Sequence, residues 1–326
     1  MAENHLVTVV IPTRNRPLLV LRAVGTALNQ TYSTLEVVVV IDGPDDDTVE
    51  ALRGVTDPRL RFVALSENVG GSEARNVGVR ESRGDWIAFL DDDDEWLPEK
   101  IAKQMAAIDS LTNKHTFLSC KFIERSHGQT RTYPVRLPRP GETIDGYMCC
   151  PRGFRAHGEY LQTSTLIVPR SLMMDVPFVR GLKRGQEFVW LIEAGTRGGA
   201  AFHVLPETLS FFNAAGFTDE MRVSSKPNWR SLYSCLKGRQ HLFDPESYRY
   251  CIATRILTDA ITCDEPFMVK LRLLQECMST GVPSAKCLLT FLYIWIIPPL
   301  TRLRLGEMLR SLQRLGAAGK RSPIEA

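Results

Sequence analysis

The chain has 326 residues, of which 44% are hydrophobic and 24% are charged, a composition that describes a soluble globular protein. Its formal net charge of +3 is too small to support nucleic acid as a partner. A chain of this length can bury a sizeable core, and we expect one α/β domain together with a second region.

The eight cysteines include no CxxC pair and no histidine at zinc-ligand spacing, so neither a zinc site nor a redox motif is indicated. Adjacency disfavours a disulfide between Cys149 and Cys150. We expect reduced core cysteines in a cytosolic compartment. Residues 1–5 lack the basic and apolar regions of a signal peptide, which predicts a protein that stays on the cytoplasmic side.

Strands and helices alternate over roughly the first hundred residues. Helical patterns follow the apolar runs, beginning near Pro17, near residue 46, around residues 74–78 and at Lys100. This alternation predicts an α/β fold with a Rossmann-like, mostly parallel sheet and helices on both faces. Buried strands are predicted at residues 7–12, 35–41, 61–65 and 86–90.

Four consecutive aspartates, residues 91–94, follow directly on the strand predicted at 86–90. Adjacent carboxylates repel one another unless a cation or solvent compensates them, and Mg²⁺ or Mn²⁺ with a phosphate suits such an all-oxygen set. In an alternative interpretation Asp94 caps a helix that begins near Pro98, which leaves Asp91 and Asp93 unexplained. An EF-hand is excluded because its glycine and glutamate positions are occupied by Trp96 and Ala102.

Ligands of parallel sheets bind at the carboxyl ends of the strands, so Asp42, Asn68 and the four aspartates should converge on one crevice. The first loop, residues 12–16, reads Pro-Thr-Arg-Asn-Arg and contains neither the GxGxxG nor the P-loop pattern. The glycine-rich loop of sugar-phosphate nucleotidyltransferases is absent there as well. A metal-dependent nucleotidyltransferase is therefore a disfavoured alternative.

Residues 9–16, 38–43, 68–78 and 89–94 together resemble family 2 glycosyltransferases of the GT-A fold. The resemblance implies an inverting transferase that uses a nucleotide-sugar donor and Mg²⁺ or Mn²⁺. By position it implies metal binding by Asp91 and Asp93, with Asp93 as the more direct ligand. The nucleotide-binding residues that it implies are Pro12, Thr13, Arg14, Asp42, Asn68, Gly71, Arg75, Asp91 and Asp92.

Some of these assignments have structural alternatives. Arg75 could be a surface residue of its helix, and Asn68 could simply form a turn. A diphosphate leaving group develops negative charge, which a metal held by carboxylates stabilises.

The middle of the chain should shape the acceptor side. Strands are predicted at 117–124, 129–135 and 162–170 in a region that is otherwise irregular. The resemblance implies that Glu187, at a helix start, is the general base. Its preceding acid is replaced by Gln186, and Glu193 is the alternative base.

A second departure is the segment 211–216, where many relatives carry Arg and His and this chain carries neither. The two departures motivate another alternative, a catalytically degenerate nucleotide-sugar binder or assembly partner.

Residues from about 217 to 285 are predicted to be helical, most clearly at 248–261 and 268–278. An apolar run at 288–300 contains two prolines and is shorter than the ~20 residues of a spanning helix. The stripe that follows, between Leu305 and Leu315, is flanked by arginines, which is typical of a helix on an anionic membrane surface. Packing on the protein's own core or on a second subunit explains the pattern equally well.

These observations predict a division into four parts. Residues 1–110 would bind the nucleotide sugar and 111–216 the acceptor and catalytic base, followed by a helical extension at 217–285 and an apolar, basic segment at 286–326. The predicted activity is inverting transfer from a UDP-sugar to a saccharide or lipid-linked acceptor hydroxyl in cell-surface polysaccharide synthesis. The predicted location is cytoplasmic and peripheral on the inner face of the plasma membrane, through residues 286–315, with a homo-oligomer as an open alternative.

Overall fold

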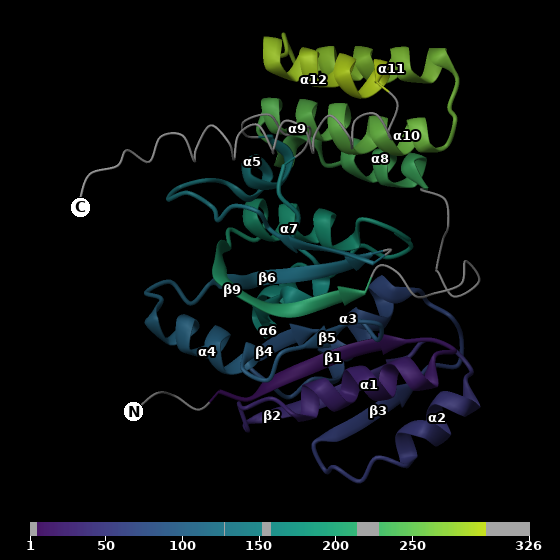
Figure 1. Ribbon diagram of the computed structural model, residues 1–326, viewed down its shortest axis with the longest axis vertical. Helices are drawn as coiled ribbons and strands as arrows, with labels where there is room; N and C mark the ends of the chain where they lie inside the picture. Colours follow the sequence, from purple (N-terminus) through teal and green to yellow (C-terminus); the bar gives the residue numbers. More distant parts are fainter. Residues whose placement is uncertain (1–4, 127, 152–157, 214–227, 298–326) are drawn as a thin grey trace, which may run out of the picture. The chain divides into compact units, whose positions relative to one another are not determined.

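The computed structural model describes residues 5–126, 128–151, 158–213 and 228–297 (Figure 1). The chain divides into two compact units. Unit 1 comprises residues 1–144 and 159–225, and unit 2 comprises residues 145–158 and 226–326.

Unit 1 is built on a sheet that has nine strands within the described ranges. These are β1 (Val7–Thr13), β2 (Leu35–Ile41), β3 (Leu60–Ala64), β4 (Trp86–Phe89), β5 (Glu95–Trp96), β6 (Thr116–Ser126), β7 (Gln129–Tyr133), β8 (Ile167–Pro169) and β9 (Ala201–Asn213). The order is β3-β2-β1-β4-β8-β6-β9-β5, with β7 paired to β6. The four strands from β3 to β4 are parallel, whereas β8 is antiparallel to both β4 and β6. The predicted class, a mostly parallel sheet with helices, is confirmed.

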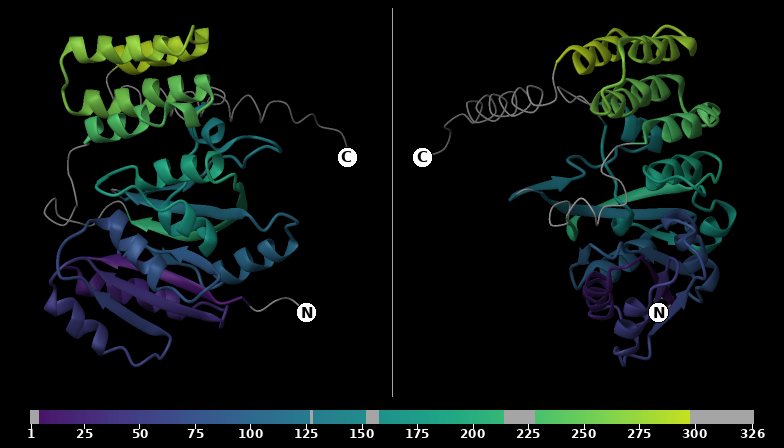
Figure 2. Two further views of the ribbon diagram at one scale, coloured as in Figure 1. Left: turned by 180° about the vertical axis from the view of Figure 1, so that it is seen from behind. Right: turned by 90° about the vertical axis from the view of Figure 1, so that its right-hand side faces the viewer.

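Helices cover both faces of the parallel half of the sheet (Figure 2). The helices of unit 1 are α1 (Pro17–Leu28), α2 (Asp46–Arg53), α3 (Gly71–Glu81), α4 (Lys100–Ser110), α6 (Arg170–Asp175) and α7 (Gln186–Thr196). On one face Val9 and Val37 share a core cluster with α1 and α4, and on the other face Val38 and Val40 pack with α3. This division follows from the alternation of side chains along each strand. Gly78 lets α3 lie directly on β1, because a Cβ there would be 2.3 Å from Val10 Cγ1.

The prediction of a strand at 162–170 is wrong for the first half of that range. Residues Thr163–Thr165 form a 3₁₀ turn, and only Ile167–Pro169 pair as β8. The Gln162 side chain accepts a hydrogen bond from the backbone N–H of Ser164 at 2.8 Å, and Thr165 Oγ1 donates to the carbonyl of Gln162 at 2.6 Å. Such local bonds give the backbone an alternative to the sheet ladder.

The secondary structure of unit 2 is helical within its described residues, and the helices from α8 onward are green to yellow in Figure 2. Its helices are α5 (Ile144–Cys149), which begins at the unit boundary, α8 (Trp229–Lys237), α9 (Pro245–Cys251), α10 (Leu257–Thr262), α11 (Phe267–Ser279) and α12 (Ala285–Ile296). The helix predicted at 248–261 is present, although a π-helical turn, Ile252–Ile256, joins α9 to α10. No disulfide joins the described cysteines.

A buried carboxylate ties three helices of unit 2 together. Glu276 of α11 accepts hydrogen bonds from Tyr233 and Lys237 of α8 and from Tyr248 of α9, at 2.9, 2.8 and 3.0 Å. These donors outweigh the cost of burial, and the pKa of Glu276 is lowered. None of the helices within the described ranges combines the length and the apolar character that crossing a bilayer would need.

Candidate functional site

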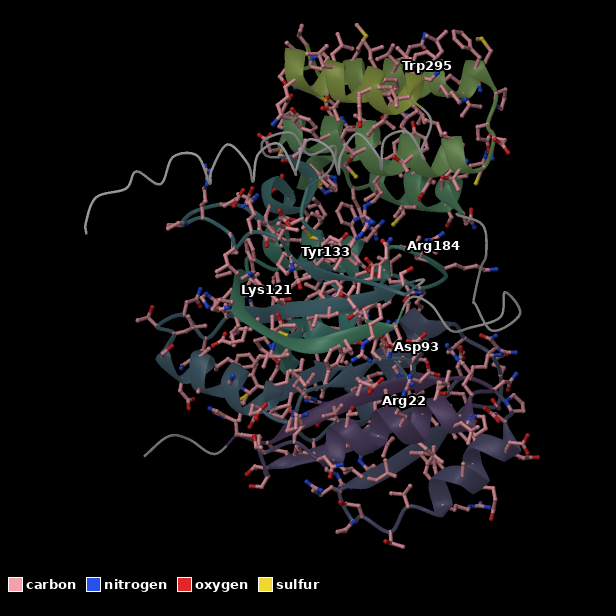
Figure 3. All side chains as sticks on the ribbon, in the orientation of Figure 1. Arg22, Asp93, Lys121, Tyr133, Arg184 and Trp295 are labelled. Carbon is pink, nitrogen blue, oxygen red and sulfur yellow. The ribbon has the colours of Figure 1, made fainter. Side chains whose placement is uncertain are left out.

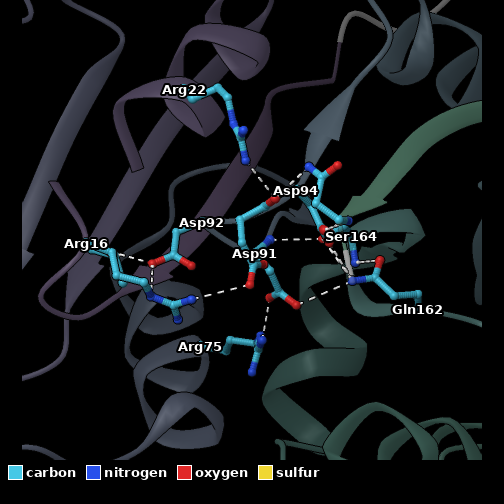
Figure 4. Close-up of polar contacts among 11 residues, drawn as sticks. Arg16, Arg22, Arg75, Asp91, Asp92, Asp94, Gln162 and Ser164 are labelled. Carbon is cyan, nitrogen blue, oxygen red and sulfur yellow. Dashed lines mark hydrogen bonds and ion pairs between the residues drawn. The ribbon is translucent and has the colours of Figure 1, made fainter. Parts of the chain in front are cut away.

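The strand ends of unit 1 meet as the sequence predicts. Thr13 ends β1, Asp42 follows β2, and the aspartates follow β4. The backbone N–H of Asp42 donates to the Thr13 carbonyl at 2.8 Å, and Thr13 Oγ1 donates to Asp92 at 2.7 Å. Residues 91–94, hereafter the acid loop, thus lie beside the end of β1, and Figure 4 shows their polar contacts.

Asp94 faces inward and holds the acid loop in place. It is fully buried and accepts hydrogen bonds from Gln162 Nε2 and Ser164 Oγ, both at 2.6 Å, and from the N–H of Asn213 at 3.3 Å. Burial and the charges of its neighbours in the acid loop raise its pKa well above the ordinary value. The interpretation of Asp94 as a helix cap is wrong, because α4 begins only at Lys100 and the donors to Asp94 lie elsewhere.

Asp92 also faces inward. It is 2% exposed, and besides Thr13 it pairs with Arg16 Nε at 3.1 Å. Burial raises the pKa of Asp92 to about 7, although Arg16 acts in the opposite direction.

Asp91 and Asp93 are the more accessible members of the acid loop, with side chains 23% and 25% exposed. Asp91 pairs with Arg75, and Asp93 pairs with Arg16 Nη1 at 3.3 Å. The Asp93 carbonyl accepts hydrogen bonds from Arg22 at 3.0 Å and from Asn213 at 2.8 Å. Burial and the negative charge of Asp91 raise the pKa of Asp93. The two carboxylates therefore lie close enough to repel each other.

This donor set suits a hard divalent cation, since it offers carboxylate oxygens whose mutual repulsion a cation would relieve. Asp91 and Asp93 are the residues that could hold it. In the described part of the chain no three His, Cys, Asp or Glu side chains form a metal-binding group by themselves.

Arg75 connects the acid loop to α7. Its Nη2 donates to Asp91 and its Nη1 donates to Gln186 Oε1 at 2.7 Å. Burial alone would lower the pKa of Arg75, but the charges of Asp91 and Glu187 raise it. Only 9% of Arg75 is exposed, so the alternative of a surface residue is wrong. Its Nε is buried without a hydrogen-bond partner among the described residues.

Glu187, the predicted base, lies in the first turn of α7 and is half-buried. The negative charge of Glu187 interacts with Arg75, which places it on the Arg75 side of the acid loop. The alternative base, Glu193, is 5% exposed and farther along the same helix.

The carboxylate of Asp42 is hydrogen-bonded by backbone N–H groups. It accepts hydrogen bonds from the N–H groups of Val69 at 2.7 Å and Gly70 at 3.0 Å. Asn68 Oδ1 also accepts from Gly70 N–H, at 3.0 Å, which fits its predicted alternative as a turn residue. These bonds fix the loop that leads into Gly71, the first residue of α3. Pro12 is half-buried within β1, and Arg14 is exposed in the loop that follows this strand.

Five residues that contact the acid loop were not assigned from the sequence, namely Arg16, Arg22, Gln162, Ser164 and Asn213. Arg16 lies inside the motif at residues 9–16, so it could have been found there. The other four contact the acid loop from 68 to 120 positions away along the chain, and no local pattern indicates such contacts. Asn213 falls in the segment that lacks the relatives' Arg and His, and it supplies polar contacts there.

The fold and the acid loop define a class: an α/β protein whose parallel strands end at a carboxylate-rich, arginine-lined site. Residues 8–158 match the family model of glycosyl transferase family 2.

Two of the curated relatives are named for the biosynthesis of succinoglycan and of colanic acid. The succinoglycan biosynthesis protein ExoO of Rhizobium meliloti is 39% identical over 198 residues, which cover 59% of this chain and 56% of ExoO. The putative colanic acid biosynthesis glycosyl transferase WcaA of Escherichia coli is 30% identical over 42% of this chain and 50% of WcaA. WfaP of Escherichia coli, named a UDP-Glc:alpha-D-GlcNAc-diphosphoundecaprenol beta-1,3-glucosyltransferase, is 33% identical over 31% of this chain and 40% of WfaP. The chain spans about half the length of these relatives.

Among solved structures, TarS 1–349 of S. aureus in complex with UDP-GlcNAc superposes with a TM-score of 0.53 at 19% identity. The match covers 84% of this chain and 72% of that one. At this identity the likeness supports the fold alone.

Proposed function

We propose that the protein is an inverting glycosyltransferase that moves a sugar from a UDP-sugar to a hydroxyl of a saccharide or lipid-linked acceptor in polysaccharide synthesis. The observation that carries this proposal is the Arg75 bridge, which joins the carboxylates of the acid loop to the helix of Glu187. The names of ExoO, WcaA and WfaP support polysaccharide assembly. The UDP-glucose in the name of WfaP and the UDP-GlcNAc bound by TarS support a UDP-sugar donor.

In this proposal the donor binds along the strand ends. Thr13, Arg14, Asn68, Gly71 and Arg75 contact the nucleotide together with Pro12 and Asp91, and Asp42 and Asp92 contribute by fixing the loops that they hold. Asp91 and Asp93 hold Mg²⁺ or Mn²⁺. When bound, the metal neutralises the charge that develops on the departing diphosphate.

Glu187 supplies the chemistry on the acceptor side. Its carboxylate takes the proton of the acceptor hydroxyl while the oxygen attacks the anomeric carbon, and the bond from that carbon to the diphosphate breaks on the opposite face. Arg75 is charged next to both Asp91 and Glu187, so it can orient the two carboxylates together. Gln186 contacts Arg75 without adding a further negative charge.

The predicted location belongs to the same proposal. We infer a cytoplasmic protein held peripherally on the inner face of the plasma membrane, which suits a lipid-linked acceptor. The predicted contact segment, residues 286–315, lies partly outside the described residues. A homo-oligomer and the predicted four-part division of roles also remain proposals.

Calorimetry of UDP and GDP binding, with and without Mn²⁺, tests the donor site. UDP should bind wild type only with Mn²⁺, and Asp93→Ala should abolish this metal-dependent binding because one of the two accessible carboxylates is lost. Asp109→Ala, which removes an exposed aspartate of α4, is the matched control and should bind as wild type does. If neither nucleotide binds under any condition, the donor assignment fails.

A binder without turnover is the second candidate, because Gln186 replaces the acid that precedes the base in the family. Release of UDP from UDP-sugars in the presence of acceptor separates the two. Metal-dependent binding without any release for a panel of donors and acceptors would favour the binder.

A further inference from the structure

Arg16 lies at the start of α1 and contacts two aspartates of the acid loop (Figure 4). Its Nε pairs with the Asp92 carboxylate at 3.1 Å, and its Nη1 pairs with the Asp93 carboxylate at 3.3 Å. The Arg16 side chain is 17% exposed, so it reaches the accessible side of the acid loop. The proposed donor site leaves Arg16 without a role, although its positive charge lies against one of the two carboxylates that would hold the metal.

Asp92 and Asp93 differ in what else holds them. Asp92 is buried and also accepts a hydrogen bond from Thr13 Oγ1 at 2.7 Å. Within the described ranges, Arg16 is the only other residue that pairs with the carboxylate of Asp93. A change of partner at Arg16 would therefore free the Asp93 carboxylate and leave Asp92 in place.

The backbone of Asp93 is held independently of Arg16. Its carbonyl accepts hydrogen bonds from Arg22 Nη2 at 3.0 Å and from Asn213 Nδ2 at 2.8 Å, and Figure 3 labels Arg22 and Asp93. The next residue, Asp94, is anchored by three separate hydrogen bonds. The acid loop can thus keep its shape while the Asp93 carboxylate exchanges one cation for another.

Arg75 provides the contrast. Only 9% of Arg75 is exposed, and while one nitrogen pairs with Asp91, another donates to Gln186 of α7 at 2.7 Å. This second element fixes the Arg75 guanidinium from outside the acid loop. Both ion pairs of Arg16 are with the acid loop itself, so Arg16 is the arginine that can turn away from its carboxylate.

We propose that Arg16 is a counter-ion that a divalent cation displaces from Asp93, and that its guanidinium then binds the diphosphate of the donor. This inference rests on the proposed function. A cation ligated by Asp93 and the Arg16 guanidinium carry like charges and compete for one carboxylate. The buried Asp92 keeps Nε and serves as a pivot, while the other nitrogens turn to the phosphate oxygens. A planar guanidinium suits phosphate because it donates two parallel hydrogen bonds.

Two binding measurements on the full chain test this exchange. Mn²⁺ is titrated alone and followed by the electron paramagnetic resonance signal of the free ion, and UDP is titrated calorimetrically at saturating Mn²⁺. Arg16→Gln should bind Mn²⁺ alone about two- to five-fold more tightly than wild type, because a part-exposed ion pair no longer competes. It should bind UDP about ten-fold more weakly, because a charged contact to phosphate is lost. A purely structural role would weaken both.

Two other arginines serve as references. Arg22→Gln removes the same charge from the Asp93 carbonyl but leaves the carboxylate pair intact, so it should tighten Mn²⁺ binding less than Arg16→Gln does. Arg53→Gln is the matched control, since Arg53 is 67% exposed on α2, and both of its affinities should equal those of wild type. Equal gains in Mn²⁺ affinity for Arg16→Gln and Arg22→Gln would reduce the effect to a general field and overturn the exchange.

Arg16→Lys serves where Arg16→Gln fails to fold, because it keeps a positive charge beside the buried Asp92. A single ammonium cannot hold Asp92 and a phosphate with separate nitrogens, so UDP binding should weaken about five-fold. The exchange is overturned, and the donor site stands, if wild type binds UDP with Mn²⁺ while the Arg16 variants bind UDP equally well or lose Mn²⁺ and UDP affinity in parallel. If wild type binds neither, the donor site itself fails.

Discussion

The acid loop contains two kinds of aspartate that alternate along the chain. Asp92 and Asp94, the inner pair, are at most 2% exposed, whereas Asp91 and Asp93, the outer pair, are 23% and 25% exposed. The inner pair accepts hydrogen bonds from neutral donors, including Thr13 and Ser164, and Asp92 also pairs with Arg16. Each aspartate of the outer pair has an arginine partner, and its charge faces the accessible side of the acid loop. Adjacent aspartates of the acid loop thus serve two purposes. The inner pair fixes the loop, and the outer pair presents negative charge.

The largest expected contrast between the two pairs is in stability. Asp94→Ala should lower the free energy of unfolding by about 3 kcal/mol, because two buried donors and one part-buried donor lose their acceptor. Asp93→Ala should lower it by less than about 1 kcal/mol, because its carboxylate is part-exposed. Urea unfolding of both variants measures the difference. Asp94→Asn keeps one acceptor oxygen and should fall between them, and equal losses for the two alanine variants would contradict the division.

Lys100, a buried lysine that follows the acid loop, gives a second test of how burial shifts the pKa of a charged group. Lys100 lies 4.0 Å from the Trp96 ring and donates to Gln104 at 2.7 Å, and burial lowers its pKa to about 8. In the unfolded chain the pKa returns to about 10.4, so between these values the unfolded state binds more protons and stability rises with pH. The contribution of Lys100 should rise by about 1.4 kcal/mol per pH unit within that window.

Chemical unfolding from pH 7 to 10, with Lys100→Met as the reference, measures this contribution. The difference in free energy of unfolding between wild type and Lys100→Met should change between about pH 8 and pH 10, because the methionine variant carries no charge at this position. A constant difference would show that Lys100 does not titrate there.

The outer pair should depend on the geometry of its arginines. Arg75→Lys keeps the charge but cannot reach Asp91 and Gln186 with two separate nitrogens. We expect Mn²⁺-dependent UDP binding to weaken about ten-fold, roughly 1.4 kcal/mol. Arg53→Lys, on the exposed end of α2, is the control. Undiminished binding by Arg75→Lys would mean that charge alone suffices.

Much of the fold could be predicted from the sequence because its signals are local. The β-branched runs of β1 and β2 mark buried parallel strands, and Pro17 marks the start of α1. The acid run and the motifs around it also indicate the site at the strand ends. Helix α11 lies within a few residues of its predicted bounds, 268–278, whereas the apolar run at 288–300 was not predicted as a helix and its first part belongs to α12.

Contacts between distant residues could not be predicted in this way. The turn Thr163–Thr165 replaces a predicted strand because its side chains bond to their own backbone and to Asp94. Arg75 is buried because α7, more than a hundred residues later, returns to cover it.

The sequence by itself determined the four aspartates of the acid loop, the order in which strands and helices alternate along the chain, and the apolar character of α12. The tertiary structure alone decided which aspartates face inward and which distant residues, such as Gln162 and Ser164, hold them. The physical reason is that periodicity and turn chemistry act over a few residues, whereas burial and pairing depend on which segments the folded chain brings together.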